Sequence, residues 1–203
     1  MKKLTLPALG TLALSLACSS VFAADGTITI NGMITDETCT LAGSGSGVNG
    51  SQNLVLTLDT VLKSTFTATN MTAARKNFSL QLKNAAGTGN CDASTNKALK
   101  GLYLSPISTA DLDTTDKTLL VNKATEGGAS IANPVYIQIL TDADIAVNLS
   151  EPWGVQAKSA ITGLAADGSG TATMLYKAQY ASKTGTVSGQ NVTAVVNYTL
   201  QYN

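Results

Sequence analysis

Hydrophobic and polar residues alternate in two stretches near opposite ends of the chain. In residues 26–34 the apolar row, with one glycine in it, consists of Ile28, Ile30, Gly32 and Ile34. In residues 192–202 every even position is apolar or aromatic: Val192, Ala194, Val196, Tyr198, Leu200 and Tyr202. A period of two predicts β-strands with one apolar face. A glycine weakens such a strand and removes packing, so Gly32 favours a strand that docks on a surface too shallow for a side chain.

Shorter strands are predicted between these two stretches, separated by turn signals. Residues 42–52 are rich in Gly, Ser and Asn and are predicted to be a loop, and residues 72–75 are compatible with a helical turn. The predicted strands are Leu54–Leu58, Phe78–Leu82, Gly101–Leu104, Lys117–Val121, Pro134–Leu140, Ile145–Leu149 and Ala172–Ala181. The Pro134–Leu140 and Ile145–Leu149 strands are expected to form a hairpin. Frequent turns without a long helical pattern predict an all-β, Greek-key sandwich of immunoglobulin type.

The first 23 residues predict a secretory signal peptide. A basic start is followed by an apolar run over residues 4–17, which is too short to span a membrane, and by the cleavage motif Val21–Ala23. Cys18 offers a rival interpretation, lipid attachment at that cysteine. Such sites usually have Leu three positions earlier, where this chain has Ser15, so we favour the signal peptide. Residues 1–23 are therefore expected to be removed, leaving a domain-sized mature chain.

Charge and cysteine content narrow the classes of function. Removing Lys2 and Lys3 from the 13 basic residues leaves 11 against 13 acidic ones, so the mature chain has a net charge near −2. A chain with this charge shows no basic patch of the kind that binds nucleic acid. Two cysteines remain, Cys39 and Cys91, and an even number in an exported protein indicates one disulfide. Closing a loop of that length stabilises the fold by roughly 4 kcal/mol in the chain-entropy account.

The order of these features resembles that of the type 1 fimbrial (chaperone–usher) major pilins. The shared features are the leader, the alternating N-terminal strand with its glycine, the two cysteines, and Gly189 and Tyr202 near the C-terminus. The resemblance covers the whole mature chain. The family usually has its second cysteine soon after a strand, whereas Cys91 lies nine residues after Leu82. We interpret residues 84–90 as a loop insertion.

The resemblance implies a structural subunit of a surface fimbria that supports cell adhesion. The domain would be an incomplete sandwich of six strands, with a signal peptide (1–23), a donor-strand extension (24–35) and a pilin domain (36–203). After export to the periplasm, a chaperone would lend a strand to an open groove beside the C-terminal strand. At an outer-membrane usher, the donor strand of the next subunit would replace it at the cell surface. The donor residues would be Ile28, Ile30, Gly32 and Ile34, and the groove and C-terminal strand would comprise Gly189, Val192, Ala194, Val196, Tyr198, Leu200 and Tyr202.

Other classes of function remain as alternatives. A minor or tip adaptor, or a carbohydrate-binding adhesin that meets a host receptor at the tip, is the main one. Trp153 could stack on a sugar, although packing beside a turn is favoured. The acids at 111–116 and 142–144 could hold Ca²⁺, but the glycine and terminal glutamate of an EF-hand are missing, so we favour solvated loop acids. Histidine is absent, so nucleophile–histidine pairs and common zinc sets are not available, and we expect neither enzyme activity nor a cofactor.

Overall fold

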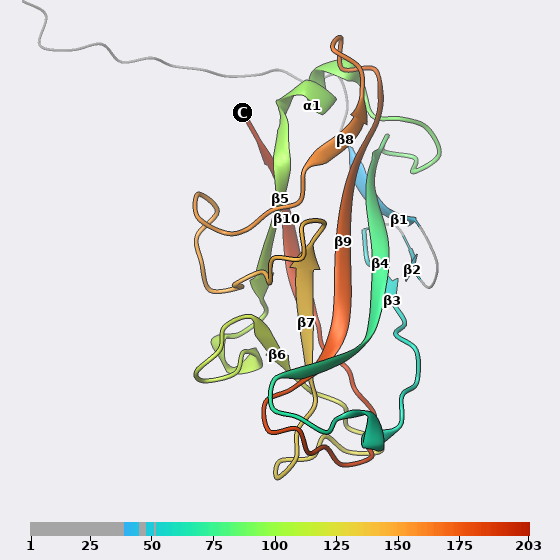
Figure 1. The fold of residues 1–203 in the computed structure, drawn as a ribbon. Coiled ribbons are helices and arrows are strands. Elements are labelled where there is room, and N and C mark those ends of the chain that lie inside the picture. The colour runs from blue at the N-terminus through green and yellow to red at the C-terminus, as the bar shows by residue number, and fades with distance from the viewer. Residues whose placement is uncertain (1–38, 45–47, 51) are drawn as a thin grey trace, which may run out of the picture. The chain divides into compact units, whose positions relative to one another are not determined.

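The computed structural model describes residues 39–44, 48–50 and 52–203. The predicted signal peptide and the predicted donor row, Ile28 to Ile34, lie outside the described residues. Within the described part, two β-sheets face each other across an apolar core (Figure 1). No helix in these ranges is long and apolar enough to cross a membrane.

The larger sheet is antiparallel throughout. Its strand order is β1-β4-β9-β7-β6, and β8 pairs with β9 beside this path. The long central strands β4 and β9 pair from Met71↔Ser182 to Gln81↔Thr173 (Figure 1). The bounds are β1 Thr40–Ser44, β4 Met71–Lys83, β6 Leu119–Val121, β7 Tyr136–Thr141, β8 Ile161–Leu164 and β9 Gly170–Ser182. Neighbours that are distant in sequence, such as β4 and β9, give the sheet its non-sequential order.

The smaller sheet consists of β5 (Leu99–Pro106) and β10 (Val196–Tyr202), which pair antiparallel. A separate short pair, β2 (Val48–Asn49) and β3 (Val55–Leu56), lies between β1 and β4 in the chain. The core between the sheets takes buried residues from both: Leu80, Leu82, Leu102, Leu104, Met174 and Tyr176. Burying each such side chain contributes about 1.5–3 kcal/mol, so this core is the main source of stability.

The structure confirms the all-β prediction and corrects some of its elements. Residues 72–75 form no helical turn, because they lie inside β4. Ala74 has a left-handed backbone (φ 52°), and the pairing register shifts between Ala73 and Lys76. This bulge interrupts the alternation of the strand, so the sequence gives no period of two there.

The predicted loop at 42–52 is also wrong in part. Ala42–Ser44 belong to β1, and Val48–Asn49 form β2. Residues 145–149 are no strand, although Val147 N–H donates to Ile139 O at 2.9 Å, as in a local hairpin. The strand at the C-terminus begins at Val196, four residues later than predicted.

Three short helices were not predicted: η1 (Lys63–Thr65), α1 (Ala93–Ala98) and η2 (Thr109–Asp111). Helix α1 begins at its N-cap Asp92, whose side chain accepts from Thr95 N–H at 2.9 Å. The helix has six residues, too few to show a hydrophobic period in the sequence.

Candidate functional site, an open groove in the smaller sheet

A groove of about 900 Å³ runs along one side of β10. Residues 52–58 line one wall, and residues 192–198 line the other. The floor between the walls consists of apolar side chains from the core and the larger sheet: Leu41, Phe78, Leu80, Leu102, Leu104, Leu120, Ile137, Ile139, Tyr176, Ala178 and Tyr180. The groove therefore reaches towards the centre of the domain, where Phe78, Ile137 and Tyr180 are half-buried and the other floor residues are buried.

Each wall presents a backbone edge that pairs with no further strand among the described residues. Among the described residues, β10 pairs with β5 only, and its other edge faces the groove. On the opposite wall, β3 pairs with β2 over two residues, and Thr57 and Leu58 form no backbone–backbone hydrogen bond in the described ranges. Unpaired strand edges are templates for an added strand. A strand that enters the groove would thus meet the backbone of β10 on one side and that of residues 55–58 on the other, where Thr57 O already accepts from Lys76 Nζ at 3.0 Å.

The other edge of the smaller sheet is closed by the buried side chain of Gln156. Its Oε1 accepts from Leu104 N–H at 2.9 Å, and its Nε2 donates to Leu104 O at 2.8 Å and to Asn148 O at 3.1 Å. Gln156 is 1% exposed. Its amide thus takes the place of a neighbouring strand beside β5. Within the part of the chain that the structure describes, the groove side of β10 remains the open edge of this sheet.

Only part of the predicted apolar row at the C-terminus lines the groove. Val192, Ala194, Val196 and Tyr198 line the groove. Leu200 packs on the core beyond the groove lining. Burial raises the pKa of the Tyr198 hydroxyl.

The two remaining predicted groove residues lie elsewhere. Tyr202 is at the end of β10, pairs with Leu99 and is 37% exposed. Gly189 is part of neither the groove lining nor β10, and lines a second hollow. Neither Tyr202 nor Gly189 therefore belongs to the residues that line the groove.

The wall formed by residues 52–58 was not predicted as part of the site. Leu54, Leu56 and Leu58 are half-buried, while Val55 and Thr57 between them are exposed. This is the period of two that predicted a strand, and the alternation is confirmed. Nothing in the local sequence shows that this segment lies opposite β10.

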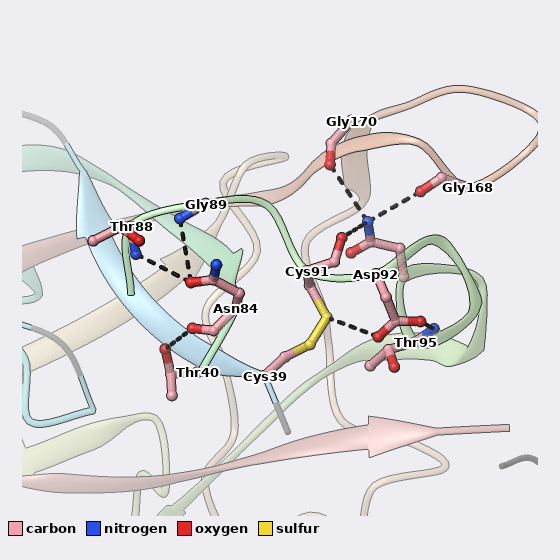
Figure 2. The surroundings of a disulfide bond; sticks show 11 residues. Cys39, Thr40, Asn84, Thr88, Gly89, Cys91, Asp92, Thr95, Gly168 and Gly170 are labelled. Atoms are coloured by element: carbon pink, nitrogen blue, oxygen red, sulfur yellow. Dashed lines mark hydrogen bonds between the residues drawn. A yellow bond between two sulfur atoms is a disulfide. The ribbon is translucent and has the colours of Figure 1, made fainter. Parts of the chain in front are cut away.

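The structure joins Cys39 to Cys91 in a disulfide with a Cα–Cα distance of 5.7 Å, which confirms the predicted pair (Figure 2). The inserted residues 84–90 fold into a turn of their own. Asn84 Oδ1 accepts from the backbone N–H groups of Thr88 and Gly89 at 3.1 and 3.2 Å. The insertion therefore does not separate the two cysteines. The side chains of Cys39, Cys91 and Asp92 also lie close enough together to be metal ligands. The two cysteine sulfur atoms are, however, bonded to each other in the disulfide.

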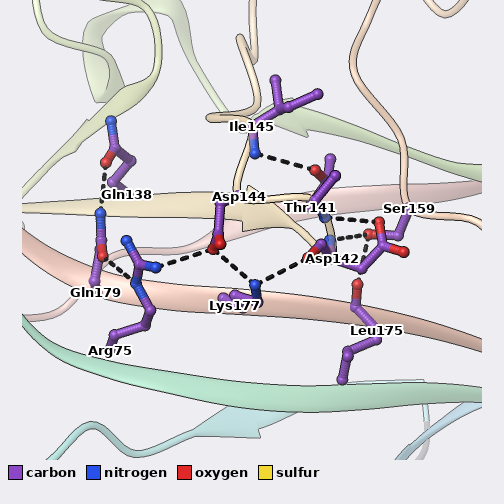
Figure 3. Close-up of polar contacts among 11 residues, drawn as sticks. Arg75, Gln138, Thr141, Asp142, Asp144, Ile145, Ser159, Leu175, Lys177 and Gln179 are labelled. Atoms are coloured by element: carbon purple, nitrogen blue, oxygen red, sulfur yellow. Dashed lines mark hydrogen bonds and ion pairs between the residues drawn. The ribbon is translucent and has the colours of Figure 1, made fainter.

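Three of the acids expected to be solvated form ion pairs instead, one of them being Asp111, whose Oδ1 lies 2.9 Å from Lys123 Nζ. Asp144 Oδ1 lies 2.7 Å from Lys177 Nζ and 2.9 Å from Arg75 Nη1 on the outer face of the larger sheet (Figure 3). The hydrogen bond from Lys177 holds the pKa of Asp144 below its ordinary value. Asp113 is buried and pairs with Lys183 at 2.8 Å. These contacts are sufficient to explain the three acids without a metal ion.

Trp153 is held by packing, as the favoured interpretation predicts. A side chain on Gly101 of β5 would meet the Trp153 ring at 3.1 Å. Lys158 Nζ lies 4.4 Å from the centroid of that ring and donates to Trp153 O at 2.9 Å. The indole therefore covers the outer face of β5.

Comparison with known proteins agrees with this architecture. No protein-family model matches the chain. The chain is 30% identical over 181 residues to the major fimbrial subunit SMF-1 of Stenotrophomonas maltophilia, covering 89% of this chain and 94% of that protein. The chain belongs to the fimbrial subunit family. It is also 30% identical over 195 residues to the F17 fimbrial protein of Escherichia coli, with 96% of each chain covered.

The fold of this fimbrial subunit is shared with a solved pilus protein. The rod subunit PapA of the P pilus matches with a TM-score of 0.51 and 16% sequence identity, covering 87% of this chain and 100% of that chain. At this identity the likeness concerns the fold. It confirms the predicted pilin-type sandwich.

Proposed function

We propose that this protein is the structural subunit of a surface fimbria, and that copies polymerise by donating residues 26–34 to one another. The observation that carries the proposal is the groove, whose two walls present backbone edges that no described strand pairs with, above an apolar floor. Membership of the fimbrial subunit family supports the same function. The apolar row of the donor segment, Ile28 to Ile34, has the period of two that a strand in this groove requires.

The energetic reason for strand donation is the partial burial of the groove residues. Val196 and Tyr198 pack against the core yet are only half-buried. An inserted strand would cover them, and each Å² of apolar surface removed from water contributes about 25 cal/mol. It would also supply hydrogen bonds to the β10 edge. The completed sandwich is therefore expected to be much more stable than the open one.

The same groove explains why partners are needed before assembly. An exposed apolar groove with open edges favours aggregation. We infer that a periplasmic chaperone occupies it first and that an outer-membrane usher exchanges the chaperone for the next subunit. Donor and acceptor are different surfaces of the chain, so the contact is head-to-tail and extends into a filament. A host receptor would be contacted through the tip of that filament.

A grafting experiment tests the proposal. Residues 26–34 are attached after Asn203 through a flexible linker long enough for the strand to run antiparallel to β10, and residues 24–33 are removed from the N-terminus. We expect a soluble monomer that needs no chaperone, forms no fibre and unfolds at markedly higher denaturant than the ungrafted chain. The matched control carries Ile28→Ser, Ile30→Ser and Ile34→Ser in the graft, and should gain no stability.

Deletion and a single substitution test the donor segment in its natural place. Removing residues 24–33 without a graft should leave a chaperone-bound monomer that makes no fibre in electron micrographs. Gly32→Leu should act similarly, because an oversized side chain in a close-packed contact costs about 1–3 kcal/mol. Fibres from the deletion variant, or a graft without effect on stability, would contradict the proposed function.

A further inference from the structure

A second hollow, of about 540 Å³, lies at the end of the domain where the chain approaches β10. Residues 187–193 line it together with residues from two other loops, 60–66 and 124–126. Tyr180, Val192 and Thr193 line both this hollow and the groove. The two are therefore continuous, and a strand that leaves the groove past Val192 enters the hollow.

The spacing of apolar residues sets the register of that strand. Half-buried positions alternate along β10 and its approach from Val192 to Leu200, and four of them, from Val192 to Tyr198, line the groove. The donor row also has four, from Ile28 to Ile34. In an antiparallel pair, matching all four places Ile34 beside Val192 and Ile28 beside Tyr198. Residues 35–38 of the donating copy then fall beside residues 188–191 of the receiving copy, over the hollow.

The way the chain enters its own domain agrees with this placement. Cys39 is bonded to Cys91, next to α1, and Asn203 N–H donates to Ala98 O at 2.9 Å at the same end. The hollow lies at the other end, where β10 begins. The five steps from Ile34 to Cys39 span at most about 18 Å. The α1 end of the donating copy must therefore approach the hollow of the receiving copy.

We propose that this hollow binds residues 35–38 of the donating copy and so fixes the junction between consecutive subunits. The inference rests on the proposed function. These residues read Thr-Asp-Glu-Thr, with two carboxylates at Asp36 and Glu37. Lys63 lines the hollow, is exposed, and its Nζ has no hydrogen-bond or ion-pair partner among the described residues. It is the cation available to these acids.

The hollow also carries an acid, Glu126, which would repel the same carboxylates. Lys63 should therefore favour binding of an acidic linker, and Glu126 should oppose it. A basic occupant would reverse these two effects, and a neutral occupant would abolish them. This gives a test of which segment occupies the hollow. An exposed ion pair is weak, so a change of about threefold is expected for reversal of the Lys63 charge.

Disulfide trapping in assembled fibres tests the placement. Gly189→Cys is a suitable probe, because Gly189 lines the hollow and a Cβ added there meets no atom within 4 Å. Combined with Glu37→Cys, which this register places beside Gly189, it should give a ladder of covalent oligomers in non-reducing denaturing electrophoresis. Glu37→Cys with Thr199→Cys is the matched control, since Thr199 is exposed on β10 but far from the hollow, and it should give no ladder. Each single variant should also give none.

Charge reversal then tests the chemistry. Adding Lys63→Glu to the trapping pair should slow formation of the ladder about threefold, whereas Glu126→Gln should not slow it. Fibres that form normally but trap Glu37→Cys on Thr199→Cys, or on neither probe, would overturn the inference and leave the proposed function intact. Trapping on Gly189→Cys that Lys63→Glu leaves unchanged would overturn the role of Lys63. Absence of fibres from the unsubstituted protein would instead count against the proposed function.

Discussion

Lys183 Nζ lies 2.8 Å from the buried Asp113 Oδ1 and thereby joins the end of β9 to the loop before β6. Burial alone would raise the pKa of Asp113. The hydrogen bond from Lys183, with those from the backbone N–H groups of Thr115 and Asp116, outweighs burial and holds the pKa well below its usual range. A carboxyl whose pKa is lowered by folding stabilises the folded state above its unfolded pKa, and this contribution is lost as the pH falls.

Acid unfolding tests this ion pair. Asp113→Asn should lower the free energy of unfolding at pH 7 by about 1–3 kcal/mol, because Lys183 and two backbone donors lose a charged acceptor. The difference from the unsubstituted protein should shrink progressively below about pH 4, where Asp113 begins to be protonated in the unfolded chain. Urea titrations at several pH values measure it. Asp142→Asn, an exposed acid without an ion pair in the described structure, should have little effect at any pH; a constant Asp113→Asn difference down to pH 2 would contradict the assignment.

The disulfide is expected to be a major contribution to stability. Replacing Cys39 and Cys91 together by Ala should lower the free energy of unfolding by about 2–5 kcal/mol, because the bridge closes a long loop in the unfolded chain. Denaturant unfolding of the double variant measures the loss. Dithiothreitol should produce a similar loss in the unsubstituted protein and none in the variant. In non-reducing mass spectrometry, two alkylatable thiols in the exported protein would contradict the bridge.

Neighbouring residues on β10 should differ in their importance for assembly. Tyr198 faces the groove, whereas Thr199 is exposed and pairs with Tyr103 on β5. Tyr198→Ser should weaken strand binding by about 1–3 kcal/mol and reduce the amount of chaperone-bound subunit and of fibre. Thr199→Ser should leave both nearly unchanged. Immunoblots of periplasmic extracts and electron microscopy give the two readouts, and equal losses would mean that β10 has no special groove face.

The side chain that closes the β5 edge gives a further prediction. Gln156→Leu removes both hydrogen bonds to Leu104 and leaves a buried N–H and C=O without partners. The cost should be about 1–3 kcal/mol in the free energy of unfolding. Gln81→Leu on β4 is the control, because the Gln81 side chain has no hydrogen bond within the described residues and is only half-buried. If both variants lose equal stability, Gln156 does not act as a substitute strand.

Several features of the fold could be predicted because their signals are local. The alternation at Phe78–Leu82, Ala172–Ala181 and the even positions of the C-terminal stretch reports directly which side of a strand is apolar. Other features could not be predicted from such signals. The bulge at Ala74 breaks the period inside β4, and the six residues of α1 are too short for a helical period.

The sequence by itself determined the all-β class, the alternating rows and the cysteine pair, since each depends on the order or number of residues in the chain. Only the tertiary structure decided that residues 52–58 face β10 across an apolar floor and that Gln156 closes β5. An open strand edge is defined by the absence of a neighbour, and the neighbours of a strand come from distant parts of the chain. Leu104 and its partner Gln156 are separated by 52 residues, and no local pattern records that contact.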